Sequence, residues 1–163
     1  MPVAAVIAAA AYEYQQNTRI LEKMVKDLTP QEWLRHPESC PNNVAWVVGH
    51  VVWTRKQLLK RLGAEWPQPW PDSFGRGRRP ESDEEYPTAE ALLAAWIEIG
   101  AWTDAALENV PEQTLAEPVS KPGPPTADGK ISGAVNFMAW HETYHLGQIS
   151  YLRSWLGHTG VMG

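Results

Sequence analysis

Four long stretches without internal proline constrain the fold of this chain more than any other feature of its sequence. Their apolar residues recur every three or four positions, which is the spacing of one face of an α-helix. Proline, glycine and asparagine separate the stretches. The predicted long helices cover approximately residues 3–27, 42–62, 88–109 and 132–156. No stretch shows the sustained alternation of a strand, so the sequence predicts an all-α fold, a four-helix bundle.

A short fifth helix is predicted between the first two long ones. The segment Thr29-Pro30-Gln31-Glu32 has the form of a capping box with proline at the first helical position. Trp33 and Leu34 would lie on this helix.

Two long connections, residues 63–87 and 110–129, are rich in proline and glycine. The first combines three aromatic side chains with three arginines: Trp66, Trp70, Phe74, Arg76, Arg78 and Arg79. Connections of this length are usually either disordered or functional. Two interpretations stay open for it: a solvated, poorly ordered loop, or a cover over a site whose arginines bind an anionic substrate.

Composition limits the classes of function. The 163 residues suit a single domain, residues 1–163. A formal net charge of -5 opposes binding to nucleic acid, and the single cysteine, Cys40, excludes an internal disulfide. No stretch approaches the roughly 20 apolar residues of a membrane span, and the first eleven residues lack the basic segment of a signal peptide. We therefore expect a cytoplasmic protein without nucleic-acid or membrane partners.

Two histidines in the last predicted helix form a candidate metal site. His141 and His145 are four residues apart, so both side chains lie on one face of the helix, about 5–6 Å from each other. Gln148 lies on the same face, which is otherwise apolar. Two buried imidazoles without partners would each cost on the order of 1–3 kcal/mol, and one shared metal ion would satisfy both. The alternative is that each histidine has a separate hydrogen bond.

A third ligand has to come from another helix, and His50 is the candidate. It lies among apolar residues in the middle of the second long helix, where burial disfavours the charged imidazolium. A hydrogen-bonded core histidine is the alternative at this position. His36 and His158 lie outside the long helices and are expected at the surface.

The chain resembles the DinB/YfiT-like superfamily. The resemblance rests on the Gly-His pair inside the apolar segment 43–54 and on Trp-His-Glu-Thr-Tyr-His-Leu-Gly-Gln-Ile at residues 140–149. It implies a bundle with up-down-down-up connectivity, a metal ion on His50, His141 and His145, and a homodimer. Zinc or nickel is the expected ion.

The resemblance also implies a function. Members of this superfamily join low-molecular-weight thiols such as bacillithiol or mycothiol to electrophiles, and others are described as hydrolases. We therefore expect a metal-dependent enzyme acting on a small molecule, with a low-molecular-weight thiol as cosubstrate. Gln148 is the candidate catalytic residue, since it could hydrogen-bond a water or substrate on the metal. A metal-dependent hydrolase and a non-catalytic metal-binding or ligand-binding bundle are the alternatives.

Overall fold

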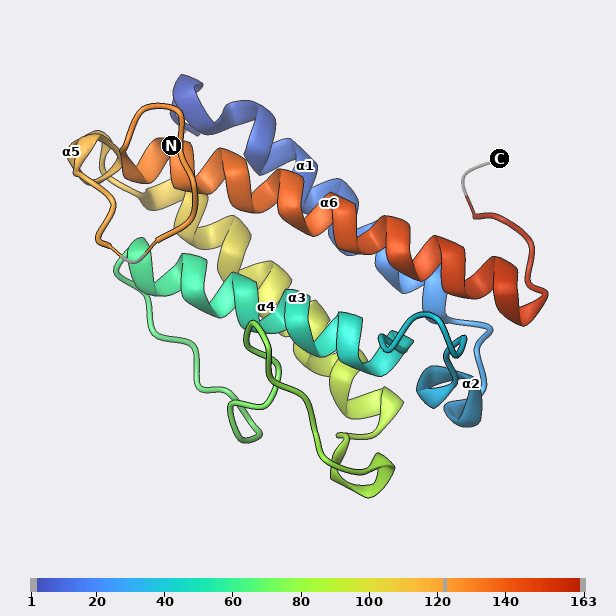
Figure 1. Cartoon of the computed structure of the whole chain (residues 1–163). Coiled ribbons are helices and arrows are strands. Elements are labelled where there is room, and N and C mark those ends of the chain that lie inside the picture. The colour runs from blue at the N-terminus through green and yellow to red at the C-terminus, as the bar shows by residue number, and fades with distance from the viewer. Residues whose placement is uncertain (1–2, 122, 162–163) are drawn as a thin grey trace.

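The computed structural model describes residues 3–121 and 123–161, and its regular elements are helices. Four of them are long: α1 (Ala8–Val25), α3 (Val44–Arg61), α4 (Ala89–Asn109) and α6 (Ile131–Leu156) (Figure 1). The short ones are η1 (Ala5–Ile7), α2 (Pro30–Leu34), η2 (Asp83–Glu85) and α5 (Glu112–Ala116). Within the described ranges, no helix is both long and apolar enough to cross a bilayer. The predicted all-α fold is confirmed.

Side-chain caps explain where the predicted helices begin. Asn43 caps α3 by accepting a hydrogen bond of 2.7 Å from the backbone N–H of Trp46. Thr88 caps α4 in the same way, and the predicted capping box at Thr29 is present before α2. α5 is a five-residue helix without a side-chain cap, and no such signal in the sequence predicts it.

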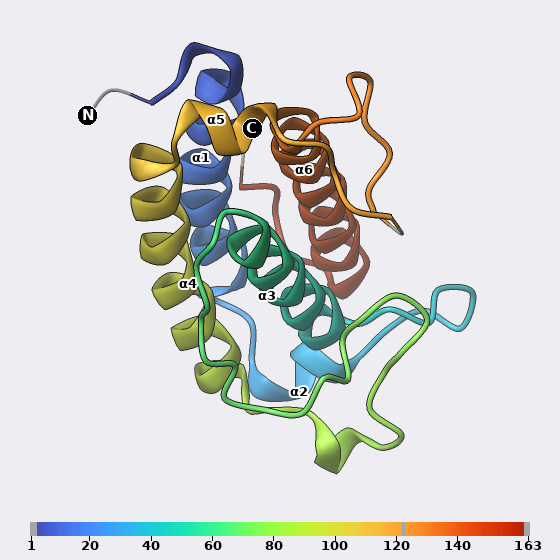
Figure 2. The same cartoon turned by 90° about the vertical axis from the view of Figure 1, so that its left-hand side faces the viewer.

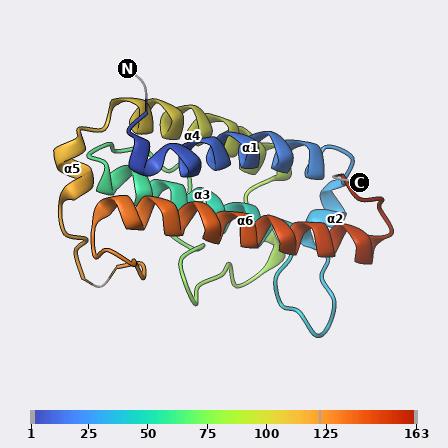
Figure 3. The ribbon, with the colours of Figure 1, turned by 90° about the horizontal axis from the view of Figure 1, so that it is seen from above.

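The four long helices form a bundle with two parallel pairs. α1 and α6 run in one direction, and α3 and α4 run in the other (Figures 1 and 3). Figure 2 looks along the bundle, where α1 packs against α4 and α6, and α3 packs against the same two helices. The up-down-down-up connectivity implied by the family resemblance is therefore present.

This topology explains the long connection between α3 and α4. Because these neighbouring helices are parallel, the chain must travel back along the bundle after α3, a distance of about 27 Å for its 18 residues. We call residues 62–88 the crossover segment. It is attached to the core by Trp66 and Phe74, which are buried, and by a 2.9 Å hydrogen bond from Trp46 Nε1 to the carbonyl oxygen of Arg78. The crossover segment therefore packs on the bundle as an ordered cover.

A buried ion pair joins all four long helices near the middle of the bundle. Arg55 of α3 and Glu142 of α6 are each 1% exposed and form two hydrogen bonds, of 2.7 Å and 2.8 Å. Arg55 also donates to the Thr18 hydroxyl and to the Tyr14 carbonyl oxygen of α1. Its guanidinium carbon lies 3.9 Å from the ring centre of Trp96 on α4. One side chain therefore contacts each of the other three long helices.

The end of α6 is fixed by a second polar cluster, and here one expectation was wrong. Arg153, which is buried, bonds the carboxylate of Asp27. Beyond α6 the chain turns back at Gly157, whose φ of 91° suits glycine. His158 is consequently half-buried, with Nε2 2.9 Å from Glu32 Oε1, and is not the free surface residue we expected. His36 is exposed, as predicted.

Replacing Glu142 with glutamine should destabilise the fold strongly. The substitution keeps the shape of the side chain but leaves the guanidinium of Arg55 buried without a counter-charge. Removing one partner of a buried pair typically costs about 3–5 kcal/mol. Chemical denaturation of the metal-free protein would measure the loss. Asp72→Asn is the matched control, because Asp72 pairs with Arg78 at the exposed surface, where an ion pair contributes about 0–1 kcal/mol. Equal effects of the two substitutions would contradict the central role of the buried pair.

Candidate metal centre

The structure brings the three predicted histidines together at the contact between α3 and α6. The ring nitrogens that could serve as ligands, one each from His50, His141 and His145, all lie within 4.8 Å of one another. Nε2 of His141 and Nε2 of His145 are 3.1 Å apart, and the ring centres of His50 and His145 are 4.6 Å apart. His50 and His145 are buried, while His141 is half-buried. The group is therefore closed toward the core and open on the side of His141.

The crossover segment orients His50. Nδ1 of His50 lies 2.7 Å from the carbonyl oxygen of Phe74. A carbonyl oxygen can only accept, so Nδ1 carries the proton and Nε2 keeps its lone pair. The indole of Trp46 stacks on the imidazole with a centroid separation of 4.8 Å, and Trp53 lies on it at 5.8 Å. His50 is thus held in the tautomer that can bind a metal through Nε2.

Gly49 makes this contact possible. A Cβ atom built on Gly49 would lie 2.5 Å from ring atoms of Phe74, which is closer than two carbon atoms can approach. Glycine inside a helix costs about 1 kcal/mol relative to alanine. The absence of a side chain lets the Phe74 ring lie directly on the helix and brings its carbonyl group to His50.

Gln148 orients His145 in the same manner. Oε1 of Gln148 lies 3.0 Å from Nδ1 of His145, so the amide oxygen accepts the Nδ1 proton and leaves Nε2 as the donor atom. This contact makes Gln148 a positioning residue. A direct contact between Gln148 and a substrate stays a prediction.

Burial keeps the three imidazoles neutral. It lowers the pKa of His50 and, with help from the nearby His50, that of His141. The pKa of His145 falls to about 4, first because of burial and second because of His50. Neutral imidazoles are the form that binds metal ions, so few protons compete for the site at neutral pH.

The arrangement fits a divalent transition-metal ion. Zinc binds histidine nitrogen at about 2.0–2.1 Å, so two nitrogens of a tetrahedral site are separated by about 3.4 Å. The Nε2 atoms of His141 and His145 are already close to that separation. A site with three protein ligands leaves a further coordination position, as in catalytic zinc sites.

Several supporting groups were not predicted from the sequence. The Phe74 carbonyl could not be found, because any backbone carbonyl looks the same in a sequence. The Arg55–Glu142 pair had a signal in the sequence: Arg55 follows the apolar segment around His50 in the same predicted helix, and Glu142 directly follows His141. In the crossover segment, Arg78 lies beside Asp72 and Arg79 bonds the Pro41 carbonyl oxygen, so both arginines contact other loop residues.

A four-helix bundle with three converging histidines on two neighbouring helices defines a class of protein able to bind a metal ion in its core. The family model of the DinB superfamily matches residues 13–149, a range that includes all three histidines. The chain therefore belongs to the DinB superfamily. No curated protein sequence matches it.

Replacing Gly49 with alanine should weaken metal binding while leaving the bundle folded. The added methyl group would displace Phe74 and remove the acceptor from His50 Nδ1. Loss of such a supporting contact typically lowers metal affinity about 10–100-fold. Competition with a chromophoric chelator would measure the affinity. Gly147→Ala is the matched control, since Gly147 lies two residues after His145 on α6 and no atom of the described residues lies within 4 Å of the added methyl. A similar affinity for both variants would refute the role of Phe74.

Acid should destabilise the metal-free protein in a range set by the buried histidines. The pKa of His145 is about 4 in the folded chain, against about 6.5 for an exposed imidazole. Between these values the unfolded state binds more protons, so the free energy of unfolding falls as the pH is lowered through this range. His145 alone contributes on the order of 3 kcal/mol to this loss. Chemical denaturation at a series of pH values would measure it.

The variant His145→Leu separates this effect from that of acidic groups. The Arg153 guanidinium holds the pKa of Asp27 at about 2, and the Thr29 backbone N–H does the same for Glu32. These carboxylates therefore affect stability only below about pH 4. The pH dependence of His145→Leu should be shallower above that value; an unchanged slope would be evidence against the buried-histidine explanation.

Proposed function

We propose that this protein is a metal-dependent transferase that joins a low-molecular-weight thiol to an electrophilic small molecule at His50, His141 and His145. The proposal rests on the kind of ligands at the site. The candidate metal group among the described residues consists of three neutral imidazoles and contains no carboxylate. A divalent ion held by this set would keep its full charge and supply Lewis acidity, which lowers the pKa of a thiol or water. Zinc and nickel both suit imidazole ligands.

The chain's own residues position the reaction. Phe74 and Gln148 fix the rings of His50 and His145, and the indoles of Trp46 and Trp53 keep water from one side of the site. In the proposed reaction the thiol loses its proton to solvent and its sulfur attacks an electrophilic carbon. A sulfur–carbon bond forms while the bond from that carbon to the leaving group breaks, and the leaving group departs with the electron pair.

A cavity beside the histidines offers room for the electrophile. It has a volume of about 310 Å³ and lies next to Gln148, between α6 and the segment before α3. Tyr144 and Tyr151 of α6 line it, together with Cys40 and Asn42 of the segment before α3. No histidine of the described residues lines the cavity, but Gln148 of the lining bonds His145, and the ring centre of Tyr144 is 5.3 Å from that of His145. Aromatic walls favour a substrate with a flat apolar body.

Hydrolysis is the alternative chemistry, because the same ion would also activate water. The carboxylate nearest to the ligands in the sequence is Glu142, and Arg55 binds both of its oxygens. Glu142 is therefore not free to act as a general base for water. This contact favours the thiol reaction over hydrolysis.

The exposed face of α6 supports the homodimer that we propose for this protein. Four aromatic side chains lie along one side of the helix at intervals of four and seven residues, and each is at least 40% exposed: Trp140, Tyr144, Tyr151 and Trp155. Exposed aromatic rows of this kind are typical of protein–protein contacts.

Turnover of a chromogenic haloarene with a panel of small thiols would test the proposed function. We expect thiol-dependent turnover by the metal-loaded protein, and only the uncatalysed rate after chelation or with His50→Ala. Elemental analysis of untagged protein would identify the ion, and His50→Ala should contain less of it. His36→Ala is the matched control, because His36 is exposed and, among the described residues, its side chain bonds just the Pro37 carbonyl oxygen.

Three results would reject the transferase. Equal rates for metal-loaded, metal-free and His50→Ala protein would show that the site does not catalyse the reaction. Ester hydrolysis without thiol dependence would identify a hydrolase. Full metal binding by the wild-type protein without any turnover would indicate a non-catalytic bundle.

A further inference from the structure

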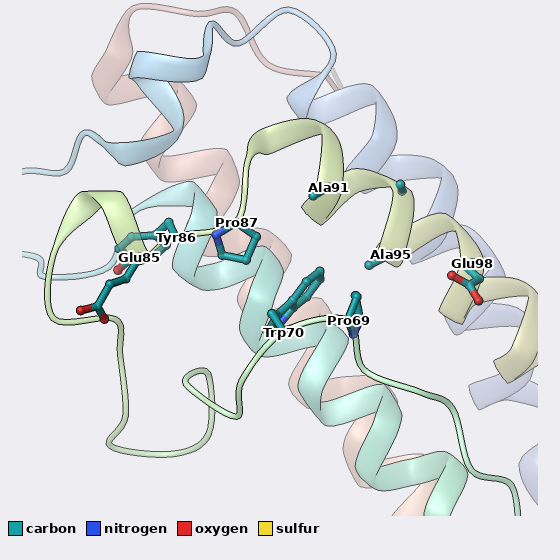
Figure 4. A pocket seen from close by; sticks show the side chains of 9 residues that line it. Pro69, Trp70, Glu85, Tyr86, Pro87, Ala91, Ala95 and Glu98 are labelled. Carbon is teal, nitrogen blue, oxygen red and sulfur yellow. The ribbon is translucent and has the colours of Figure 1, made fainter.

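A second cavity lies between α4 and the crossover segment, and it shares no lining residue with the cavity beside Gln148. It has a volume of about 500 Å³ and is bounded by α4 on one side and by parts of the crossover segment on the other (Figure 4). Trp70 and Tyr86 supply aromatic surface, and Pro69 and Pro87 lie beside them. Across from these rings α4 presents alanines, Ala91, Ala94 and Ala95, whose small side chains leave the space open.

The aromatic wall of this cavity, formed by Trp70 and Tyr86, packs against the buried ring of Phe74. The ring of Trp70 meets that of Phe74 edge-on at a centroid separation of 6.2 Å, and Phe74 lies 6.1 Å from Tyr86. Phe74 itself is 1% exposed and rests on Gly49. The two aromatic side chains that face the cavity are therefore packed on a fixed residue, so the cavity exists before any ligand binds.

The two charged residues that line the cavity are both acidic. Glu85 and Glu98 lie at its opposite ends, as Figure 4 shows. None of the described residues that line the cavity is basic. Lys56, a basic residue of α3, is occupied by a 3.2 Å hydrogen bond to Gln68 and does not line it. The chain as a whole carries a formal net charge of -5, which adds to the local negative potential.

We propose that this cavity binds an organic cation with a compact apolar body, such as a quaternary ammonium with an aromatic substituent. The faces of Trp and Tyr attract cations through their ring quadrupoles, and they attract quaternary ammonium groups in particular. Prolines and alanines suit the apolar part of such a molecule, and Glu98 at one end and Glu85 at the other contribute negative charge; the Glu85 carboxylate also accepts a 3.0 Å hydrogen bond from the backbone N–H of Glu81. An anion would be repelled at both ends, and a neutral molecule would gain nothing from the carboxylates. This proposal is independent of the reaction at the histidines.

Binding of benzyltrimethylammonium, followed by NMR shifts of the α4 alanine methyl groups, would test the proposal on the full chain. Benzyl alcohol is the neutral probe and benzenesulfonate the anionic one. We expect the ammonium probe to bind at least about tenfold more tightly than benzyl alcohol, with shifts centred on Ala91, Ala94 and Ala95, and to weaken as salt is added. No binding of benzenesulfonate is expected.

Three surface variants test whether the ammonium probe binds in this cavity. Glu85→Gln and Glu98→Gln should each weaken binding of the ammonium probe several-fold. Glu90→Gln should leave it within about twofold, since Glu90 is exposed on the same helix but does not line the cavity. All three replace exposed side chains, so the fold should be retained. Absence of ammonium binding, equal binding of benzyl alcohol, or equal effects of Glu90→Gln and Glu98→Gln would each overturn the proposal.

Discussion

The Arg55–Glu142 pair sets the geometry on which the metal centre depends. Glu142 follows His141 directly in α6, and Arg55 lies five residues after His50 in α3. Two hydrogen bonds between the charged groups allow little sliding or rotation of one helix against the other. The imidazoles of the two helices are consequently held within reach of one ion. A buried ion pair often adds little net stability compared with apolar packing, and the benefit here is a defined register between α3 and α6.

The crossover segment contributes the second constraint. Parallel packing of α3 and α4 requires a chain segment along the outside of the bundle, and this segment passes over His50. Phe74 occupies the space left by Gly49 and presents its carbonyl oxygen to the imidazole. A connection required by the topology thus also completes the surroundings of a metal ligand. The same residue supports the aromatic wall of the cavity along α4, so one buried ring shapes both sites.

The sequence was informative where a local signal determines the structure. Helix positions followed from periodicity and from caps such as Asn43 and Thr88, and the convergence of His50 with His141 and His145 followed from apolar surroundings and family resemblance. It was uninformative where the structure depends on contacts between distant segments. The pairing of Arg55 with Glu142 and the burial of His158 beside Glu32 both depend on how the helices pack. The sequence could not predict that the crossover segment is ordered either, because its proline-rich composition is equally typical of a mobile loop.

The parallel arrangement of the first and last helices separates the two ends of the bundle. α1 begins near the end where α6 also begins, and α6 then extends over 26 residues, or about 39 Å, to the opposite end (Figure 1). A linker from the end of α6 to the beginning of α1 would need about 12 extended residues to span this distance. Circular permutation with a short linker is therefore incompatible with the fold.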